Sequence, residues 1–153
     1  MARHVFFSFH YDNDIWRANQ VRNANVVAGP DVAGFFDHSE YEEAKKAGVE
    51  GIRRMILKHL SNTTVTVVLI GSETANRPWV KYEIEQSIVR NNGLLGIYIH
   101  HLKDQNQRTS NRGAKPTVPW NVEFPTYDWD GDLDRFRREI EAAGKRSDAL
   151  GGR

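Results

Sequence analysis

Cysteine is absent from the 153-residue sequence. This absence excludes a disulfide framework, a thiol nucleophile and a zinc site with cysteine ligands, and it suits a reducing compartment. No apolar run approaches the ~20 residues needed to cross a bilayer, and the N-terminus lacks the apolar stretch and cleavage site of a signal peptide. We therefore predict a cytoplasmic protein that has no membrane partner.

The sequence also lacks an excess of either charge, since its formal net charge is +1. With 39% hydrophobic and 27% charged residues, the composition excludes a largely disordered chain. The near-neutral balance gives no electrostatic footprint for nucleic acid, so we predict no such partner. The length fits one domain, which we place at residues 1–143. Residues 144–153 lack apolar periodicity and are predicted to form a disordered tail.

A glycine-rich phosphate loop is missing as well, because the sequence contains neither GxGxxG nor GxxxxGK[ST]. The absence of both motifs argues against a Rossmann dinucleotide site and against a P-loop nucleotide triphosphatase. Any nucleotide must therefore be held in another way.

Three runs of β-forming residues stand out: "HVFFSF" at residues 4–9, "TVTVVLIG" at residues 64–71 and "GLLGIYIH" at residues 93–100. A shorter candidate strand is "AGFFD" at residues 33–37. Continuous apolar runs, unlike alternating ones, are typical of parallel strands that are buried on both faces. We therefore expect a mostly parallel sheet covered by helices.

Helical patterns fill the intervals at residues 12–24, 40–60, 77–90 and 131–143. Strands that alternate with helices of this length imply right-handed crossovers. The sequence thus predicts an α/β fold, a three-layer sandwich of the flavodoxin-like type. A polar loop at residues 101–120 is too long for an ordinary connection, and we interpret it as a flexible or partner-contacting insertion.

The helix at residues 77–90 carries two glutamates, Glu83 and Glu85, in its second turn. Asn76 is its expected N-cap, and a proline follows near the first helical position. Glu85 has Lys81 four residues before it, which makes it an ordinary surface pair. Glu83 lies beside Trp79 and has no basic neighbour on its own helix, so it is either a solvated charge or a functional group.

In open parallel sheets, ligands bind outside the carboxyl ends of the strands. This rule selects Ser8 and His10, whereas Phe9 should point the other way into the core. For His10 two interpretations remain open, a ligand contact and a cap or solvent-facing side chain. The pair His100 and His101 also lies at a strand end. We predict no metal site there, because adjacent strand residues point to opposite sides and no third ligand is evident.

Three segments together carry a resemblance to a known family: "VFFSFH", "AGFFD" and "SNTTVTVVLIGSETANRPWVKYEI". In this order they resemble a Toll/interleukin-1 receptor (TIR) domain. More narrowly, they resemble the TIR-like ThsB proteins of the bacterial Thoeris antiphage system. The likeness covers roughly residues 3–101, with a weaker echo at "YDW", residues 127–129.

This resemblance implies that Glu83 is the catalytic glutamate and Glu85 a bystander. The family cleaves the bond between nicotinamide and ribose in NAD⁺, which is a substrate, so no cofactor is expected. ThsB proteins release a diffusible ADP-ribose-derived messenger, for which a cyclic form is favoured, and this messenger activates a separate effector. Self-association and a phage-derived trigger are the expected route to activation.

The resemblance also implies a substrate pocket around Glu83. Ser8 is expected to bond the nicotinamide amide or the ribose, Phe36 and Asp37 to lie near the substrate, and Trp79 to wall the pocket. Glu83 in its ionised form would stabilise the positive charge that develops on the ribose.

Two other classes remain in view. One is a non-catalytic TIR module that acts as a scaffold by self-association. The other, a response-regulator receiver, requires a phosphoacceptor aspartate at the end of a central strand. The strand at residues 64–71 ends in glycine and is followed by Ser72, which argues against a receiver.

Overall fold

In the part of the chain that the structure describes, the sheet has four strands, all parallel, in the order β1-β2-β3-β4. The structure is a computed structural model that describes residues 3–23 and 38–151, with the backbone alone at 38–39. The strands are β1 (Val5–Ser8), β2 (Val65–Ile70), β3 (Gly93–Tyr98) and β4 (Thr126–Asp128). Every residue of the first three is buried, as their continuous apolar sequences predicted. The candidate strand at residues 33–37 lies outside the described residues.

Five α-helices and one short 3₁₀ helix surround the sheet in the described part of the chain. They are α1 (Tyr11–Arg22), α2 (His38–Lys46), α3 (Gly48–Leu60), η1 (Thr74–Asn76), α4 (Pro78–Val89) and α5 (Leu133–Ala149). Within the described ranges, none of these helices combines the length and the hydropathy that a bilayer crossing requires.

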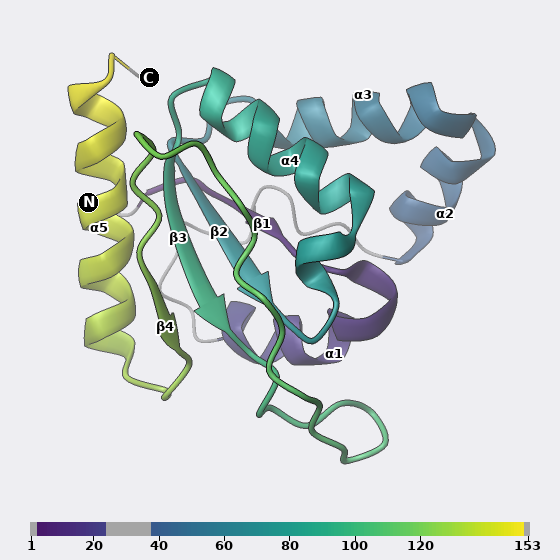
Figure 1. The fold of residues 1–153 in the computed structure, drawn as a ribbon. Helices are drawn as coiled ribbons and strands as arrows, with labels where there is room; N and C mark the ends of the chain where they lie inside the picture. The colour runs from purple at the N-terminus through teal and green to yellow at the C-terminus, as the bar shows by residue number, and fades with distance from the viewer. Residues whose placement is uncertain (1–2, 24–37, 152–153) are drawn as a thin grey trace.

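Alternate side chains of the central strands pack on opposite faces of the sheet. On β2, Val67 and Leu69 join a core with Phe136 of α5. Their neighbours Val68 and Ile70 instead pack in the cluster that contains α4 residues. Figure 1 shows α5 along one side of the sheet and α4 across the other. The three-layer α/β arrangement predicted from the sequence is therefore confirmed.

Two elements differ from the sequence-based expectation. Residues 40–60 were expected to form one helix, but they form α2 and α3 on either side of Ala47, and Gly48 has a φ of +74°. Glycine adopts this left-handed conformation without steric cost, so the chain can turn there. The strand β4 was not expected, since three residues give too little pattern to identify a strand. It pairs with β3 through Tyr127 and Ile97.

The predicted disordered tail is wrong for residues 144–149, because α5 continues to Ala149. The buried face of its last turns consists of small residues, Ala143, Gly144 and Ser147, which carry no apolar periodicity for a sequence analysis to detect. These small residues let α5 approach the sheet closely. A Cβ atom on Gly93 of β3 would collide with the carbonyl oxygen of Ala143.

Polar contacts also fasten the end of α5. The Nη2 atom of Arg146 donates a hydrogen bond to the carbonyl oxygen of Leu94 at 2.6 Å. At the other side of the helix, Arg3 pairs with Glu141 at 2.9 Å and with Asp148 at 3.0 Å. The C-terminal turns of α5 therefore belong to the folded domain.

We predict that removing residues 144–153 lowers the midpoint of thermal unfolding by several degrees or more, since it uncovers β3 and leaves the Leu94 carbonyl without Arg146. Circular dichroism melting of the truncated chain measures this effect. A chain that lacks only residues 151–153 is the matched control and should melt close to the full chain. Equal melting of all three chains would contradict the assignment of these turns to the domain.

Candidate functional site

A short hydrogen bond joins the end of strand β1 to helix α4. The hydroxyl of Ser8, the last residue of β1, donates to Oε1 of Glu83 on α4 at 2.5 Å. Ser8 is fully buried and Glu83 is 5% exposed. A carboxyl group so deep in the protein requires a specific reason, because burial of an unpaired charge is costly. The interpretation of Glu83 as a solvated surface charge is therefore wrong.

The local sequence fixes where Glu83 points. Pro78 occupies the start of α4, as predicted, where its missing N–H costs nothing. The N-cap, however, is Arg77 in an extended conformation, and Asn76 belongs to η1 instead. Val80, Ile84 and Ser87 share the buried side of the helix with Glu83, whereas Glu85 is exposed. The two glutamates thus have the different surroundings that the helical geometry predicted.

Glu83 lines a small cavity beside β1. The other lining residues are mostly aromatic and aliphatic: Phe7, Phe9, Tyr11, Tyr41, Ile52, Met55, Ile56, Arg77 and Trp79. Its volume is about 20 Å³, which is enough for about one water molecule. Drug-sized ligands occupy pockets of roughly 300 Å³ or more, so a dinucleotide enters only after side chains or segments move.

Burial decides the protonation state of Glu83. Removal from water raises the pKa of its carboxyl group to about 8, and the hydrogen bond from Ser8 and the charge of Arg77 only partly oppose this effect. The carboxyl group is therefore mostly neutral at pH 7 in this closed state. The sequence-based expectation of an ionised Glu83 is wrong for the closed cavity.

The remaining predicted site residues have different positions. His10 caps α1, since its Nδ1 atom accepts a hydrogen bond from the backbone N–H of Asn13 at 3.3 Å. Burial and the nearby Arg77 lower the pKa of His10. The capping interpretation is thus confirmed, and a ligand contact stays a prediction. Trp79 lines the cavity as expected. Phe36 and Asp37 lie outside the described residues.

Most of the residues that line the cavity were not identified from the sequence, and three of them illustrate why. Phe9 was assigned to the core, and it is buried there, but it also lines the cavity. Tyr11 and Tyr41 stack on each other with ring centroids 4.4 Å apart. Tyr41 lies far from Tyr11 in the sequence, so only the tertiary structure brings the two rings together.

Comparison with known proteins identifies the family. The family described as "Thoeris protein ThsB, TIR-like domain" matches residues 6–104, which include both Ser8 and Glu83. The chain belongs to this ThsB family. It is also 41% identical over 140 residues to the Bacillus cereus (strain MSX-D12) protein named "Putative cyclic ADP-D-ribose synthase ThsB1". That match covers 86% of this chain and 73% of the relative.

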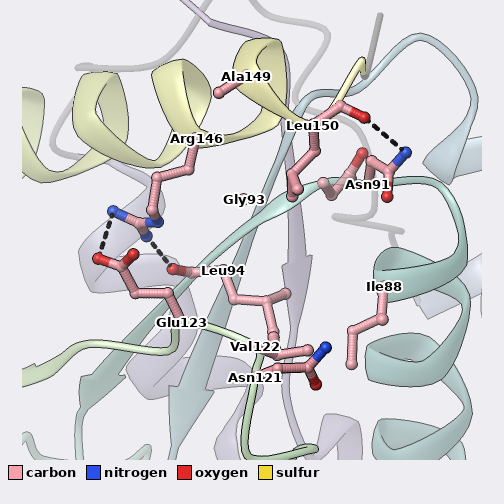
Figure 2. Close-up of a pocket in the computed structure, with 11 residues that line it drawn as sticks. Ile88, Asn91, Gly93, Leu94, Asn121, Val122, Glu123, Arg146, Ala149 and Leu150 are labelled. Carbon is pink, nitrogen blue, oxygen red and sulfur yellow. Dashed lines mark hydrogen bonds and ion pairs between the residues drawn. The ribbon is translucent and has the colours of Figure 1, made fainter.

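A roomier cavity of about 410 Å³ lies at the other end of α4 in this ThsB-family chain (Figure 2). It is lined by residues from the end of α4, the start of β3, the segment before β4 and the end of α5: Ile88, Asn91, Asn92, Gly93, Leu94, Asn121, Val122, Glu123, Arg146, Ala149 and Leu150. Its carboxylate, Glu123, is 71% exposed and lies 3.9 Å from Arg146. Among its described lining residues, the acidic group is this exposed glutamate, in contrast to the buried acid of the Glu83 site.

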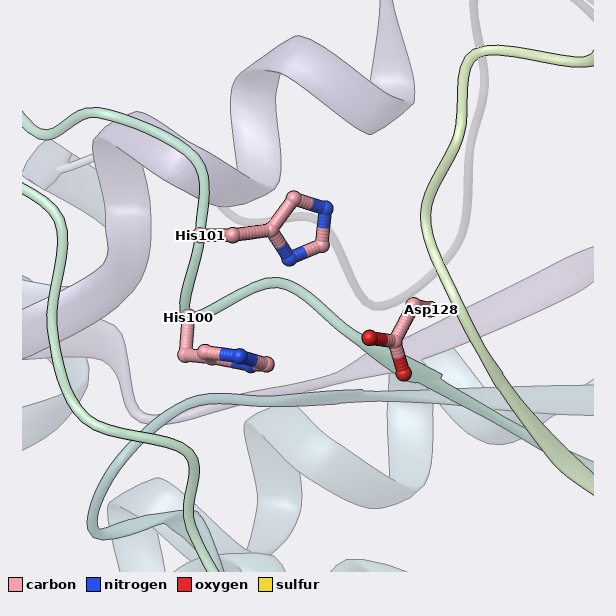
Figure 3. A group of neighbouring side chains, drawn as sticks. All are labelled: His100, His101 and Asp128. Atoms are coloured by element: carbon pink, nitrogen blue, oxygen red, sulfur yellow. The ribbon is translucent and has the colours of Figure 1, made fainter.

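Within the described ranges, one group of side chains could hold a metal ion: His100, His101 and Asp128, whose candidate ligand atoms lie within 4.8 Å of one another. Both sequence-based reasons against a metal are wrong here. The two histidines lie in a turn beyond the end of β3, so strand alternation does not separate them. Asp128 of β4, a strand that was not predicted, supplies a third group (Figure 3).

We predict that Glu83→Gln changes how stability depends on pH. Between pH values of about 4.5 and 8, folded Glu83 keeps a proton that the unfolded chain loses, so the stability of the wild type falls as pH rises through this window. The glutamine side chain does not titrate. The free energy of unfolding of the variant should therefore rise relative to that of the wild type by on the order of a few kcal/mol across the window. Urea unfolding at several pH values measures this difference.

The control is Glu85→Gln, which removes an exposed carboxylate from the same turn of α4. Its pH dependence should follow that of the wild type. Parallel stability curves for the wild type and Glu83→Gln would show that Glu83 titrates normally in the folded protein.

Proposed function

We propose that this protein consumes NAD⁺ by cleaving the bond between nicotinamide and ribose, and that it releases a cyclic ADP-ribose-type messenger in antiphage defence. The observation that carries the proposal is the buried Glu83 carboxyl group, which accepts a hydrogen bond from Ser8 and lines a cavity with aromatic walls. Membership of the ThsB family and the name of the Bacillus cereus relative support this chemistry. NAD⁺ is the substrate, and no further cofactor is proposed.

One carboxyl group suffices for this reaction. When the C1′–N bond of NAD⁺ breaks, its electron pair goes to the pyridinium nitrogen and nicotinamide departs as a neutral molecule. Most glycosidases need a second carboxylic acid because their leaving group is a poor alkoxide. Here the ribose becomes an oxocarbenium ion, and an adjacent carboxylate stabilises its positive charge. Glu83 supplies that carboxylate.

The raised pKa of Glu83 fits a cationic substrate. In the closed cavity the carboxyl group is mostly neutral, but a pyridinium cation beside it favours the ionised form and lowers its pKa again. Substrate entry therefore creates the charge that the reaction needs. The ring of Trp79 and the neighbouring aromatic side chains offer the cation a favourable face.

The nucleophile that captures the ribosyl cation sets the product. Water gives ADP-ribose and a proton, whereas a nitrogen of the substrate's own adenine closes a ring. We favour the cyclic product because the relative is named as a cyclic ADP-D-ribose synthase. Mass spectrometry of the reaction mixture distinguishes the two products, since the cyclic one is lighter by one water.

Because the cavity is small, the protein must change conformation before it can bind NAD⁺, so its activity depends on activation. With a volume of about 20 Å³, the cavity does not admit the nicotinamide riboside part of NAD⁺ unless the surrounding residues move. We propose that self-association, brought about by a phage-derived trigger, stabilises the open form. The released product then reaches a separate downstream effector by diffusion.

We predict that Glu83→Gln lowers kcat/KM for NAD⁺ cleavage by at least about a hundredfold, since it removes the charge that stabilises the transition state. Release of free nicotinamide from NAD⁺ measures the activity, with and without a crowding agent and a lysate of infected cells. Glu85→Gln, on the exposed side of the same turn, should retain wild-type activity. Equal activity of the two variants would contradict the role proposed for Glu83.

A non-catalytic scaffold is the second candidate, and one observation favours it. Leu150, which lines the cavity of Figure 2, is 62% exposed, and Trp120, the residue before the lining residue Asn121 in the sequence, is 97% exposed. Exposed apolar groups next to a hollow are typical of protein contact surfaces. A scaffold would release no nicotinamide under any of the conditions above, and defence would survive Glu83→Gln.

A further inference from the structure

We propose that His100, His101 and Asp128 form a binding site for a divalent transition-metal cation, with Zn²⁺ as its best-suited ligand. The three residues come from the turn after β3 and from the end of β4, which lie side by side at the carboxyl edge of the sheet. Figure 3 shows the two imidazole rings and the carboxylate around one space. The site is separate from Glu83, whose partner Ser8 ends β1, since β2 lies between β1 and the strands β3 and β4 that carry the cluster.

The chemistry of the donor set suits zinc. Two imidazole nitrogens and one carboxylate oxygen are common zinc ligands, and a water molecule usually completes the tetrahedron. The candidate atoms lie within 4.8 Å of one another, so small rotations of side chains bring them to a common ion. Ca²⁺ and Mg²⁺ prefer oxygen ligands and fit these histidines poorly.

His101 is already oriented for coordination. Its Nε2 atom donates a hydrogen bond to the carbonyl oxygen of Trp129 at 2.6 Å. The tautomer with a proton on Nε2 leaves the lone pair of Nδ1 free to bind a metal. A ligating histidine in proteins almost always donates its other ring N–H in this way, to a carboxylate or a backbone carbonyl.

One ring nitrogen of His100 makes no hydrogen bond in the described part of the chain. Its Nδ1 atom is buried and finds no hydrogen-bond partner among the residues that the structure describes. An unpaired buried polar atom is costly, and a bound ion would satisfy it.

The carboxylate of Asp128 is paired with Arg112, which would compete with a metal ion for it. Arg112 donates hydrogen bonds from Nη1 to the two carboxylate oxygens of Asp128 at 2.8 and 3.0 Å. The guanidinium group also lies 3.8 Å from the centre of the Tyr98 ring. Both partners of this ion pair are about half exposed. A cation that binds Asp128 must share or displace Arg112, so this pair tunes the affinity of the site.

A bound ion would add a further link between the turn after β3 and the end of β4, which already pair through Tyr98 and Asp128. The turn at His100 and His101 begins the long segment that returns to β4, and Asp128 ends that strand. An ion between them closes this segment into a loop, which restricts the unfolded chain and stabilises the folded one. The proposed role is therefore structural.

The experiment uses the full chain, stripped with a chelator and titrated with Zn²⁺ against a chromophoric zinc indicator. We expect one Zn²⁺ per chain and a higher midpoint of thermal unfolding when Zn²⁺ is present. His101→Gln and Asp128→Asn change exposed residues and should each weaken binding by about tenfold or more and abolish the thermal shift. His4→Gln, which changes an exposed histidine outside this cluster, is the matched control and should bind as the wild type does.

Arg112→Gln provides a test of opposite sign. Because it frees the carboxylate of Asp128, it should strengthen Zn²⁺ binding, whereas Asp128→Asn weakens it. Absence of stoichiometric binding, or equal affinity in the wild type, His101→Gln and Asp128→Asn, would overturn the proposal. Binding and melting are measured without NAD⁺, so the result does not depend on the proposed enzymatic activity.

Discussion

The hydrogen bond between Ser8 and Glu83 is the interaction on which the functional account depends. It links the carboxyl end of β1 to α4 at 2.5 Å, in surroundings from which water is almost excluded. An acid in this position lowers the stability of the fold as soon as it ionises. Acids with strongly shifted pKa values cluster at functional sites, and a positively charged ligand beside Glu83 would offset the cost of its ionisation. The short strand, the proline that starts α4 and the aromatic cavity together hold the group in place.

Much of this arrangement could be predicted from the sequence. Long apolar runs identified β1, β2 and β3 as buried parallel strands, because each carries a full set of β-forming residues. Helical spacing separated Glu83 from Glu85, since residues two apart on a helix face different directions. The resemblance to the ThsB family then selected Glu83, and the family match includes it. Its pairing with Ser8 required the fold, because the two residues lie 75 positions apart.

The errors have a common physical origin in tertiary packing. The end of α5 is helical because small residues fit it against Gly93, and small residues leave no apolar pattern in the sequence. The strand β4 exists because it pairs with β3, and three residues have little preference of their own. Missing this strand also concealed Asp128, so the histidine pair was dismissed for want of a third ligand. The protonation of Glu83 depends on how completely neighbouring elements cover it, which spacing along one helix does not reveal.

The most direct test of the central claim is a carbon-13 NMR titration of the Glu83 side-chain carboxyl group, assigned by comparison with Glu83→Gln. The free protein should show an apparent pKa of about 8 for this carboxyl group. Addition of NAD⁺, or of a non-cleavable analogue that keeps the pyridinium charge, should shift that pKa downward, since the cation favours the ionised form. An ordinary glutamate pKa in the free protein, unchanged by the cationic ligand, would contradict a buried acid that awaits a positive charge.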